Sequence, residues 1–152
     1  MNPPERPLTL MREEAAIRQI EAAIAAFERG LFDVAITLAG AAEGMFDYRK
    51  DGTIFDSMLV NPIAQERFSR KEWISILNME RDWLKHSSNK VEPVTFDIDS
   101  TAYMIARAAS KMPSWTTAMK DFKTWYMVRI SQMLESDGVS RTARPVIADD
   151  ID

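Results

Sequence analysis

The chain has 152 residues, 46% of them apolar and 28% charged, which is the composition of one folded domain with its own core. It has no cysteine and a single histidine, His86, which excludes disulfides, thiolate metal sites, cysteine nucleophiles and a histidine metal cage within one chain. A net charge of −4 argues against a protein that binds nucleic acid or an anionic membrane nonspecifically over its surface.

The N-terminal part of the chain predicts an extended arm followed by a helical hairpin. Residues 1–8 hold three prolines, which favour extended backbone. Over residues 10–29 apolar side chains recur at steps of three and four, which predicts a helix that Gly30 ends as its C′ residue. A second helix is predicted for residues 32–48, and its wide surface of small apolar residues should place it centrally. The short break between the two helices predicts that they are antiparallel.

Turn signals and a capping motif organise the middle of the chain. The pairs Asp51-Gly52 and Asn61-Pro62 each indicate a turn, and a short helix is predicted between them, over residues 54–60. Ser69 and Glu72 have the spacing of a capping box, in which each side chain accepts a hydrogen bond from the other residue's backbone. This motif predicts the start of a long helix.

The remaining segments complete an all-α chain. The helix that the capping box opens should run to about His86, and a further helix is predicted for residues 97–111. A proline separates it from a last helix, residues 114–135, after which residues 136–152 turn polar and are expected to form a disordered tail. No segment alternates with period two, so we expect an antiparallel bundle of four to five helices over residues 9–135.

Charge is concentrated on the helix that ends near His86. Residues 67–90 carry a net charge of +3, so the remainder of the chain carries −7. On a helical wheel Arg81 and Lys85 lie beside the apolar arc, with Asp82 between them and the histidine. Arg81 and His86 are 140° apart on an ideal helix, so they meet at one phosphate only if the helix unwinds at its end or a second chain supplies one group. A solvated helix surface explains the same charges.

The residue types on this flank suit phosphate chemistry. Arg81 offers two donors to a phosphate and stays protonated. His86 is able to take a proton from a ribose 2′-hydroxyl or to return one to a leaving oxygen near neutral pH. The pair therefore suffices for metal-independent RNA cleavage, with Lys85, Ser87 and Asn89 as further candidate contacts to the bound nucleotide. The same residues also fit a plain helix end, in which the cations complement the helix dipole.

Three segments resemble the HEPN domain family. The stretch Arg81 to His86, Arg-Asp-Trp-Leu-Lys-His, looks like the family's signature of an arginine, a polar residue and a histidine. Residues 26–36 and 39–43 are similar to the family's first hairpin, with a glycine break and an Ala-rich helix that ends in a glutamate. The resemblance covers about residues 10–112.

The resemblance implies a homodimer of helical bundles in which the two motifs meet and, in active members, cleave RNA without a metal. Carried over to this chain, Arg81 would hold the scissile phosphate, His86 would be the general acid and base, and Asp82 would be the polar helper. The aspartate departs from the more common asparagine and adds negative charge beside a phosphate site. Many members of the family have lost cleavage and serve as binding modules.

Two functions stay open from the sequence. The first is a ribonuclease, toxin-like or RNA-processing, for which an antitoxin-like protein is a candidate partner. The second is a non-catalytic module that binds a nucleotide or a partner protein through the same flank. In both cases we expect a cytoplasmic protein without cofactor or metal. We also expect a homodimer, because the broad apolar surface of the second helix should exceed what a monomer exposes. No membrane segment is expected, because no run of 18 apolar residues occurs.

Two glutamates and the tryptophans have alternative roles. Glu80 falls within the apolar arc of its helix and Glu43 lies on the Ala-rich second helix, so each needs a partner. An ion pair across the bundle is one explanation, with Arg129 as the candidate partner of Glu80, and a catalytic carboxylate is the other. The four tryptophans stand in apolar stripes, which predicts core anchors, with stacking platforms for bases as the alternative.

Overall fold

The computed structural model describes residues 5–46, 61–86 and 92–142. Within these ranges the chain contains helices and no strand, which confirms the predicted all-α class. The helices are α1 (Arg12–Glu28), α2 (Phe32–Gly44), α4 (Pro62–Arg67), α5 (Arg70–Lys85), α6 (Ile98–Ser110) and α7 (Thr117–Thr142). The helix predicted for residues 54–60 and the turn predicted at Asp51-Gly52 lie outside the described residues.

A tight turn at Gly30 joins α1 to α2, as the sequence predicts. Gly30 has a φ of 73°, a left-handed conformation that side chains with a Cβ rarely adopt. Its N–H donates to the Phe27 carbonyl and the Leu31 N–H donates to the Ala26 carbonyl, both at 2.9 Å. These two bonds form a Schellman motif, which satisfies carbonyls at the end of α1 and turns the chain directly into α2.

Polar side chains fix where three of the later helices begin. The capping box at α5 is confirmed, because Ser69 Oγ accepts from the Glu72 N–H at 3.3 Å and the Glu72 carboxylate accepts from the Ser69 N–H at 2.8 Å. Asp97 accepts two backbone N–H groups in the first turn of α6. At Asn61-Pro62 the sequence predicts only a turn, whereas the asparagine caps α4 and the proline occupies its first position.

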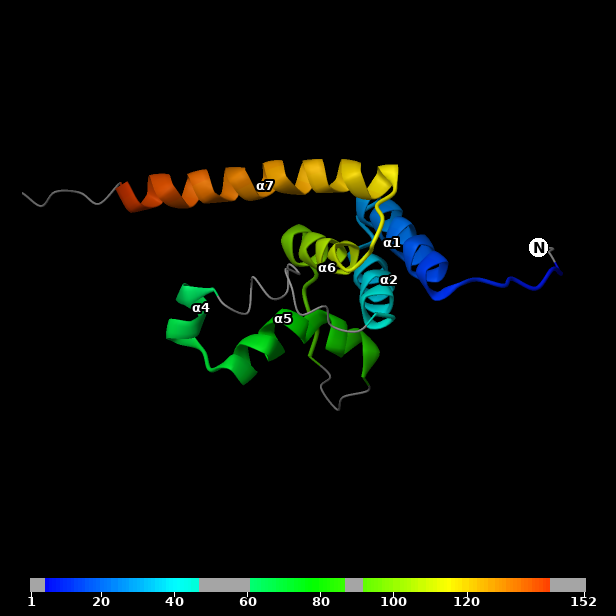
Figure 1. Ribbon diagram of the computed structural model, residues 1–152. Helices are drawn as coiled ribbons and strands as arrows, with labels where there is room; N and C mark the ends of the chain where they lie inside the picture. Colours follow the sequence, from blue (N-terminus) through cyan, green and yellow to red (C-terminus); the bar gives the residue numbers. More distant parts are fainter. Residues whose placement is uncertain (1–4, 47–60, 87–91, 143–152) are drawn as a thin grey trace, which may run out of the picture.

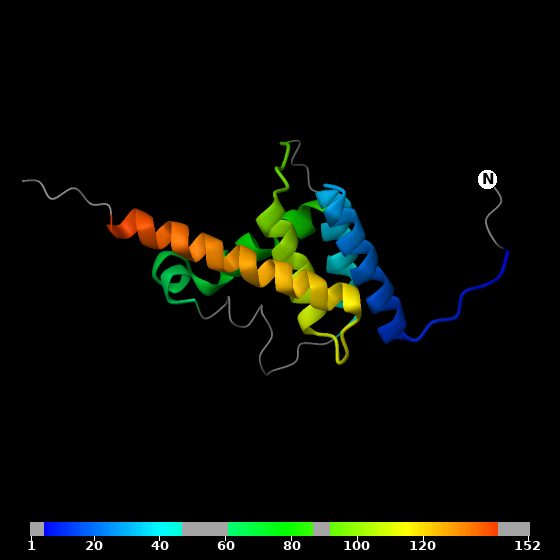
Figure 2. The ribbon, with the colours of Figure 1, turned by 90° about the horizontal axis from the view of Figure 1, so that it is seen from above.

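Helix α2 occupies a central position, as predicted, and packs against α1, α5 and α6. Figures 1 and 2 show α6 between α5 on one side and α7 on the other, with α1 and α2 side by side at one end. Alanines fill much of the core, which brings the helices close together because a methyl group needs little space. The alanines with no exposed surface are Ala16, Ala23, Ala35, Ala39, Ala42, Ala102 and Ala108.

Helix α7 departs from its predicted bounds at both ends. It begins at Thr117 rather than at residue 114, because the hydroxyl of Thr116 accepts from the Met119 N–H at 3.4 Å and so caps the helix there. It also includes residues 136–142, which the sequence assigned to a tail, and it continues past the other helices as a projecting arm (Figure 1). No described helix, this one included, has both the length and the apolar character needed to cross a membrane.

The tryptophans are less buried than the prediction of core anchors requires. Trp83 is 38% exposed and Trp125 is 37% exposed. Trp73 and Trp115 are half-buried at the edges of the core. Each indole therefore packs on the core with one side and meets solvent with the other, which leaves stacking on a ligand open as the alternative role.

Candidate functional site

The last turn of α5 carries the residues that the sequence singled out. The helix ends at Lys85, and His86 is its C-cap residue, with extended backbone angles (φ −114°, ψ 128°). The His86 N–H still donates to the Asp82 carbonyl at 3.0 Å, so the histidine is anchored directly at the helix end. The unwinding that the helical wheel requires for Arg81 and His86 to approach each other thus begins at His86 itself. Its side chain is exposed, as is that of Lys85.

Arg81 is held by carboxylates on two sides. Its Nη1 donates to Oε2 of Glu43, on the neighbouring helix α2, at 3.0 Å. Its Nε and Nη2 donate to Asp82 Oδ1 at 3.1 and 3.0 Å. The Arg81 side chain is 23% exposed and that of Asp82 is 44% exposed. The guanidinium therefore has one edge fixed in the interior and another edge that meets a carboxylate at the surface.

Glu43 is the buried centre of an ionic cluster, which we define as Glu43, Arg81, Asp82, Arg107 and Lys111. The Glu43 side chain is 5% exposed and receives Arg107 Nε on Oε1 at 2.7 Å, together with Lys111 Nζ at 3.3 Å. The cluster links α2, α5 and α6, because its members come from all three helices. An ion pair across the bundle, one of the two predictions for Glu43, is thereby confirmed.

Further hydrogen bonds satisfy Arg107, in the last turn of α6, and Lys111, the C-cap residue of that helix. Arg107 Nη1 donates to the side-chain oxygen of Asn78 on α5 at 2.7 Å. Lys111 Nζ donates to the carbonyl oxygens of Glu43 and Phe46 at 3.1 and 3.3 Å, at the C-terminal end of α2. Because buried charges are stable only when their donors find acceptors, these bonds allow two cations to sit in the core.

Three cations and two carboxylates give the ionic cluster a formal charge of +1. Burial by itself raises the pKa of Glu43, but attraction to Arg107, Lys111 and Arg81 outweighs burial and holds the pKa below its ordinary value. The neighbouring Tyr103 has its pKa raised to about 12, mainly by burial and against the opposing attraction of Arg107. The glutamate is therefore ionised and the tyrosine neutral at pH 7.

Gly40 makes room for Arg81. A Cβ at this position of α2 would lie 2.9 Å from Arg81 Cγ and 3.0 Å from Cδ, closer than carbon atoms pack. By contrast, a Cβ at Gly44, one turn further along the same helix, would have no atom within 4 Å. The stem of Arg81 thus crosses α2 at Gly40, where a side chain would collide with it, and not at Gly44, where there is room for one.

A surface groove of about 390 Å³ lies beside the ionic cluster. Asp82 and His86 both line it, so the structure brings these two predicted site residues to one wall, and Arg81 is joined to the groove through Asp82. Trp83 and Met79 contribute apolar surface to the same wall. The other predicted contacts, Ser87 and Asn89, lie outside the described residues.

One predicted partnership is wrong. Arg129 does not pair with Glu80 but binds Asp99, with Nε–Oδ1 and Nη2–Oδ2 distances of 2.8 and 2.9 Å. Asp99 stands in the first turn of α6, which α7 crosses, and a bidentate pair forms there. Glu80 is half-buried and lines a small cavity with Tyr103.

Arg107, Lys111 and Asn78 were not singled out from the sequence. The first two stand four residues apart in a helix that is otherwise largely alanine and apolar, so they share one face. Cations on the apolar face of a helix need a carboxylate on the helix that packs against it. Glu43 is a carboxylate on the apolar face of the other Ala-rich helix, so it is the candidate partner. That correspondence was present in the sequence and points to the two helices as neighbours.

Comparisons with known proteins give no match, neither to a family model, nor to a curated protein, nor to a solved structure. The likeness to the HEPN family therefore depends on the motif residues themselves.

Proposed function

We propose that the chain is a HEPN-type protein that cleaves RNA without a metal ion, using Arg81 and His86 in a site that two copies complete. The proposal is based on the contacts that hold Arg81 between Glu43 and Asp82. Its guanidinium is anchored on Glu43 within a cluster of formal charge +1, and its outer edge leads through Asp82 to a groove that His86 also lines. An anion in this groove would meet the exposed His86, and it would reach the guanidinium of Arg81 by displacing Asp82.

The residues present suit attack by a ribose 2′-hydroxyl on the adjacent phosphate. His86 of one copy removes the 2′-hydroxyl proton while the new O–P bond forms. Arg81 stabilises the charge that develops on the phosphate oxygens. The bond to the 5′-oxygen breaks, and the protonated histidine of the second copy donates the proton that the 5′-oxygen takes up. The products are a 2′,3′-cyclic phosphate and a 5′-hydroxyl.

A stripe of exposed apolar side chains on α5 supports the proposal that two copies of the chain associate. The broad surface of α2, on which the sequence-based argument for a dimer rested, is covered within the chain by α1 and α6. Exposed apolar residues instead follow α5 at spacings of three and four: Ile76 is 41% exposed, Met79 52% and Trp83 38%. Since Met79 and Trp83 also line the groove, a copy that docks on this stripe would bring the two grooves together.

A non-catalytic binding module is the second candidate, and Asp82 is the observation that favours it. Its Oδ1 accepts from two of the three Arg81 nitrogens, so a phosphate must displace it before it obtains a two-pronged contact. In that case the groove would recognise a nucleotide or a protein through His86, Lys85 and the apolar wall, and no bond would be cleaved.

Cleavage of labelled RNA by the purified chain, in the presence of EDTA, separates the two candidates. We expect products that end in cyclic phosphate, and a rate loss of about 100-fold or more for His86→Ala, as for removal of a general acid or base. Arg81→Lys keeps the charge but not the fork and should also abolish cleavage. Lys71→Ala is the matched control, since Lys71 is an exposed cation in the first turn of the same helix and does not line the groove. If a broad panel of RNAs stays intact while nucleotides bind, the second candidate holds.

A further inference from the structure

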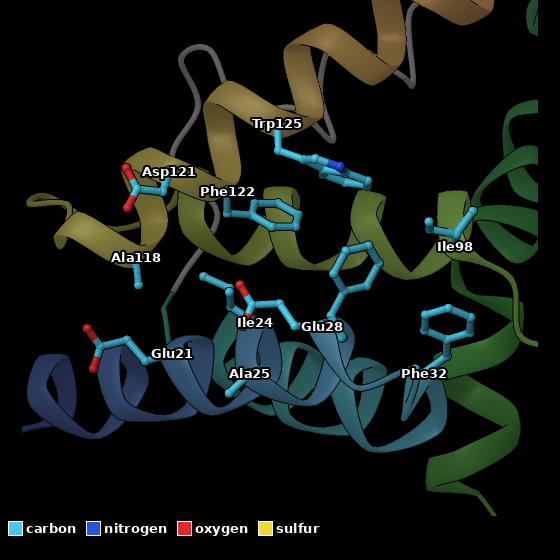
Figure 3. A pocket seen from close by; sticks show the side chains of 12 residues that line it. Glu21, Ile24, Ala25, Glu28, Phe32, Ile98, Ala118, Asp121, Phe122 and Trp125 are labelled. Atoms are coloured by element: carbon cyan, nitrogen blue, oxygen red, sulfur yellow. The ribbon is translucent and has the colours of Figure 1, made fainter.

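A cavity of about 720 Å³ lies between α1 and α7, away from the ionic cluster and the groove. Figure 3 shows its two long walls: Ile24 and Glu28 rise from α1, and Phe122 and Trp125 descend from α7 toward them. The volume is within the range of roughly 300–1,000 Å³ that is typical of pockets for small molecules. It is much larger than one amino-acid side chain requires.

Aromatic rings form the interior of this cavity. Phe27 lies at the centre of four packed rings, with its centroid 5.1 Å from Trp125, 5.8 Å from Phe122 and 5.7 Å from Phe32. Trp125 keeps 37% of its surface exposed although it lines the cavity. The face of an aromatic ring carries partial negative charge, so a wall of such rings attracts an apolar body that bears a cation.

Three carboxylates stand around the same cavity: Glu21 and Glu28 from α1 and Asp121 from α7. Among the described residues, none of the three forms an ion pair with a cation. Figure 3 shows Glu21 and Asp121 on opposite walls. The cavity thus combines an aromatic interior with negative charge on two sides, and no described basic side chain lines it.

We propose that this cavity binds a small organic cation, a protonated amine carried on an apolar body. The apolar body packs against the sides of Phe27, Phe122 and Trp125 that line the cavity, and the ammonium group lies toward the carboxylates. The volume favours a free small molecule over the side chain of a partner protein, since this open pocket is large enough to hold an entire ligand of this kind. This site is independent of the proposed ribonuclease chemistry, with which it shares no residue.

A series of three probes with one apolar body tests the charge preference: 3-phenylpropylammonium, 3-phenylpropanol and 3-phenylpropanoate. Binding to the full chain is measured by calorimetry and by NMR shifts of the tryptophan indole N–H groups. We expect the ammonium to bind about tenfold more tightly than the alcohol, and the carboxylate not to bind. Equal affinity for all three, or no binding at millimolar concentration, would overturn the proposal. So would preference for a lysine-containing tripeptide over the amine, since the occupant would then be a partner protein.

Matched variants locate the binding. Glu28→Gln should reduce the affinity for the ammonium several-fold without changing the affinity for the alcohol, whereas Glu66→Gln, an exposed glutamate on α4, should change neither. Ala25→Leu places a larger side chain on the cavity wall and should abolish binding. Ala22→Leu makes the same change at an exposed position of α1 that does not line the cavity and should leave binding intact. If both leucine variants bind equally, the amine occupies another site.

Discussion

The substitution Glu43→Gln should destabilise the fold strongly while hardly changing its shape. The glutamine is nearly the same size, so packing in α2 is kept, but the carboxylate charge is lost. Arg107 and Lys111, whose side chains are 4% and 7% exposed, then remain in the core without their carboxylate. Removing one partner of a buried ion pair typically costs about 3–5 kcal/mol. We expect the lower end, about 3 kcal/mol, because Asn78 and two carbonyls still accept hydrogen bonds from these cations.

Urea denaturation followed by circular dichroism at 222 nm measures this loss. With an m-value of about 2 kcal/mol per molar urea, a loss of about 3 kcal/mol lowers the midpoint by roughly 1.5 M. Asp99→Asn is the matched control, because it makes the same change in an exposed pair with Arg129 (39% and 35% exposed), where ion pairs contribute little. If the two variants lose the same stability, the burial of the ionic cluster does not determine its energetics and the reasoning fails.

Lowering the pH should remove the stabilisation that the ionised Glu43 carboxylate gives to the fold. The pKa of Glu43 in the folded chain is lowered from its ordinary value of 4.5, so the stabilisation from its ionised form is complete above pH 4.5. It is lost as the pH falls through the lower folded value. The difference in stability between the wild type and Glu43→Gln should therefore shrink as the pH is lowered below about 4.5.

Three further predictions follow from local geometry. Gly40→Ala should displace Arg81 and reduce RNA binding or cleavage, whereas Gly44→Ala, which meets no atom within 4 Å, should leave function intact. Ser69→Ala removes the cap of α5 and should cost about 1 kcal/mol in urea denaturation, and a loss near zero would show that the box is not formed in solution. Tyr103→Phe should lessen the loss of stability as the pH rises above 10, because the folded chain holds the tyrosine neutral to about pH 12 whereas the unfolded chain ionises it near 10.

Helix bounds follow from the sequence where a local side-chain bond or a backbone conformation sets them. Gly30 ends α1 and the Ser69 box begins α5 at the predicted residues, because both signals act within a few positions of the chain. The sequence predicts a turn at the residues where the short helix α4 begins, and so it does not predict that helix. A proline after an asparagine suits both a turn and the first position of a helix, and only the following residues distinguish them.

The partners of buried charges were harder to predict. That Glu43 needs a cation follows from its apolar neighbours, but which cation it finds depends on how α2, α5 and α6 pack. The same limit explains the wrong prediction for Arg129, which pairs with Asp99 on α6 and not with Glu80 on α5. Periodicity shows which face of a helix is apolar, and it does not show which helix lies opposite.

The ionic cluster has a consequence for the order in which the chain folds. The α1–α2 hairpin joins neighbouring segments, whereas the Glu43–Arg107 pair joins residues 64 positions apart, across a much longer loop. Until α6 docks, Glu43 on the hairpin remains hydrated and gains nothing from the cluster. The cluster should therefore form late, after the rate-limiting barrier. Glu43→Gln is then expected to accelerate unfolding while leaving the folding rate nearly unchanged. The cluster would thus slow the unfolding of the assembled bundle without helping it to form.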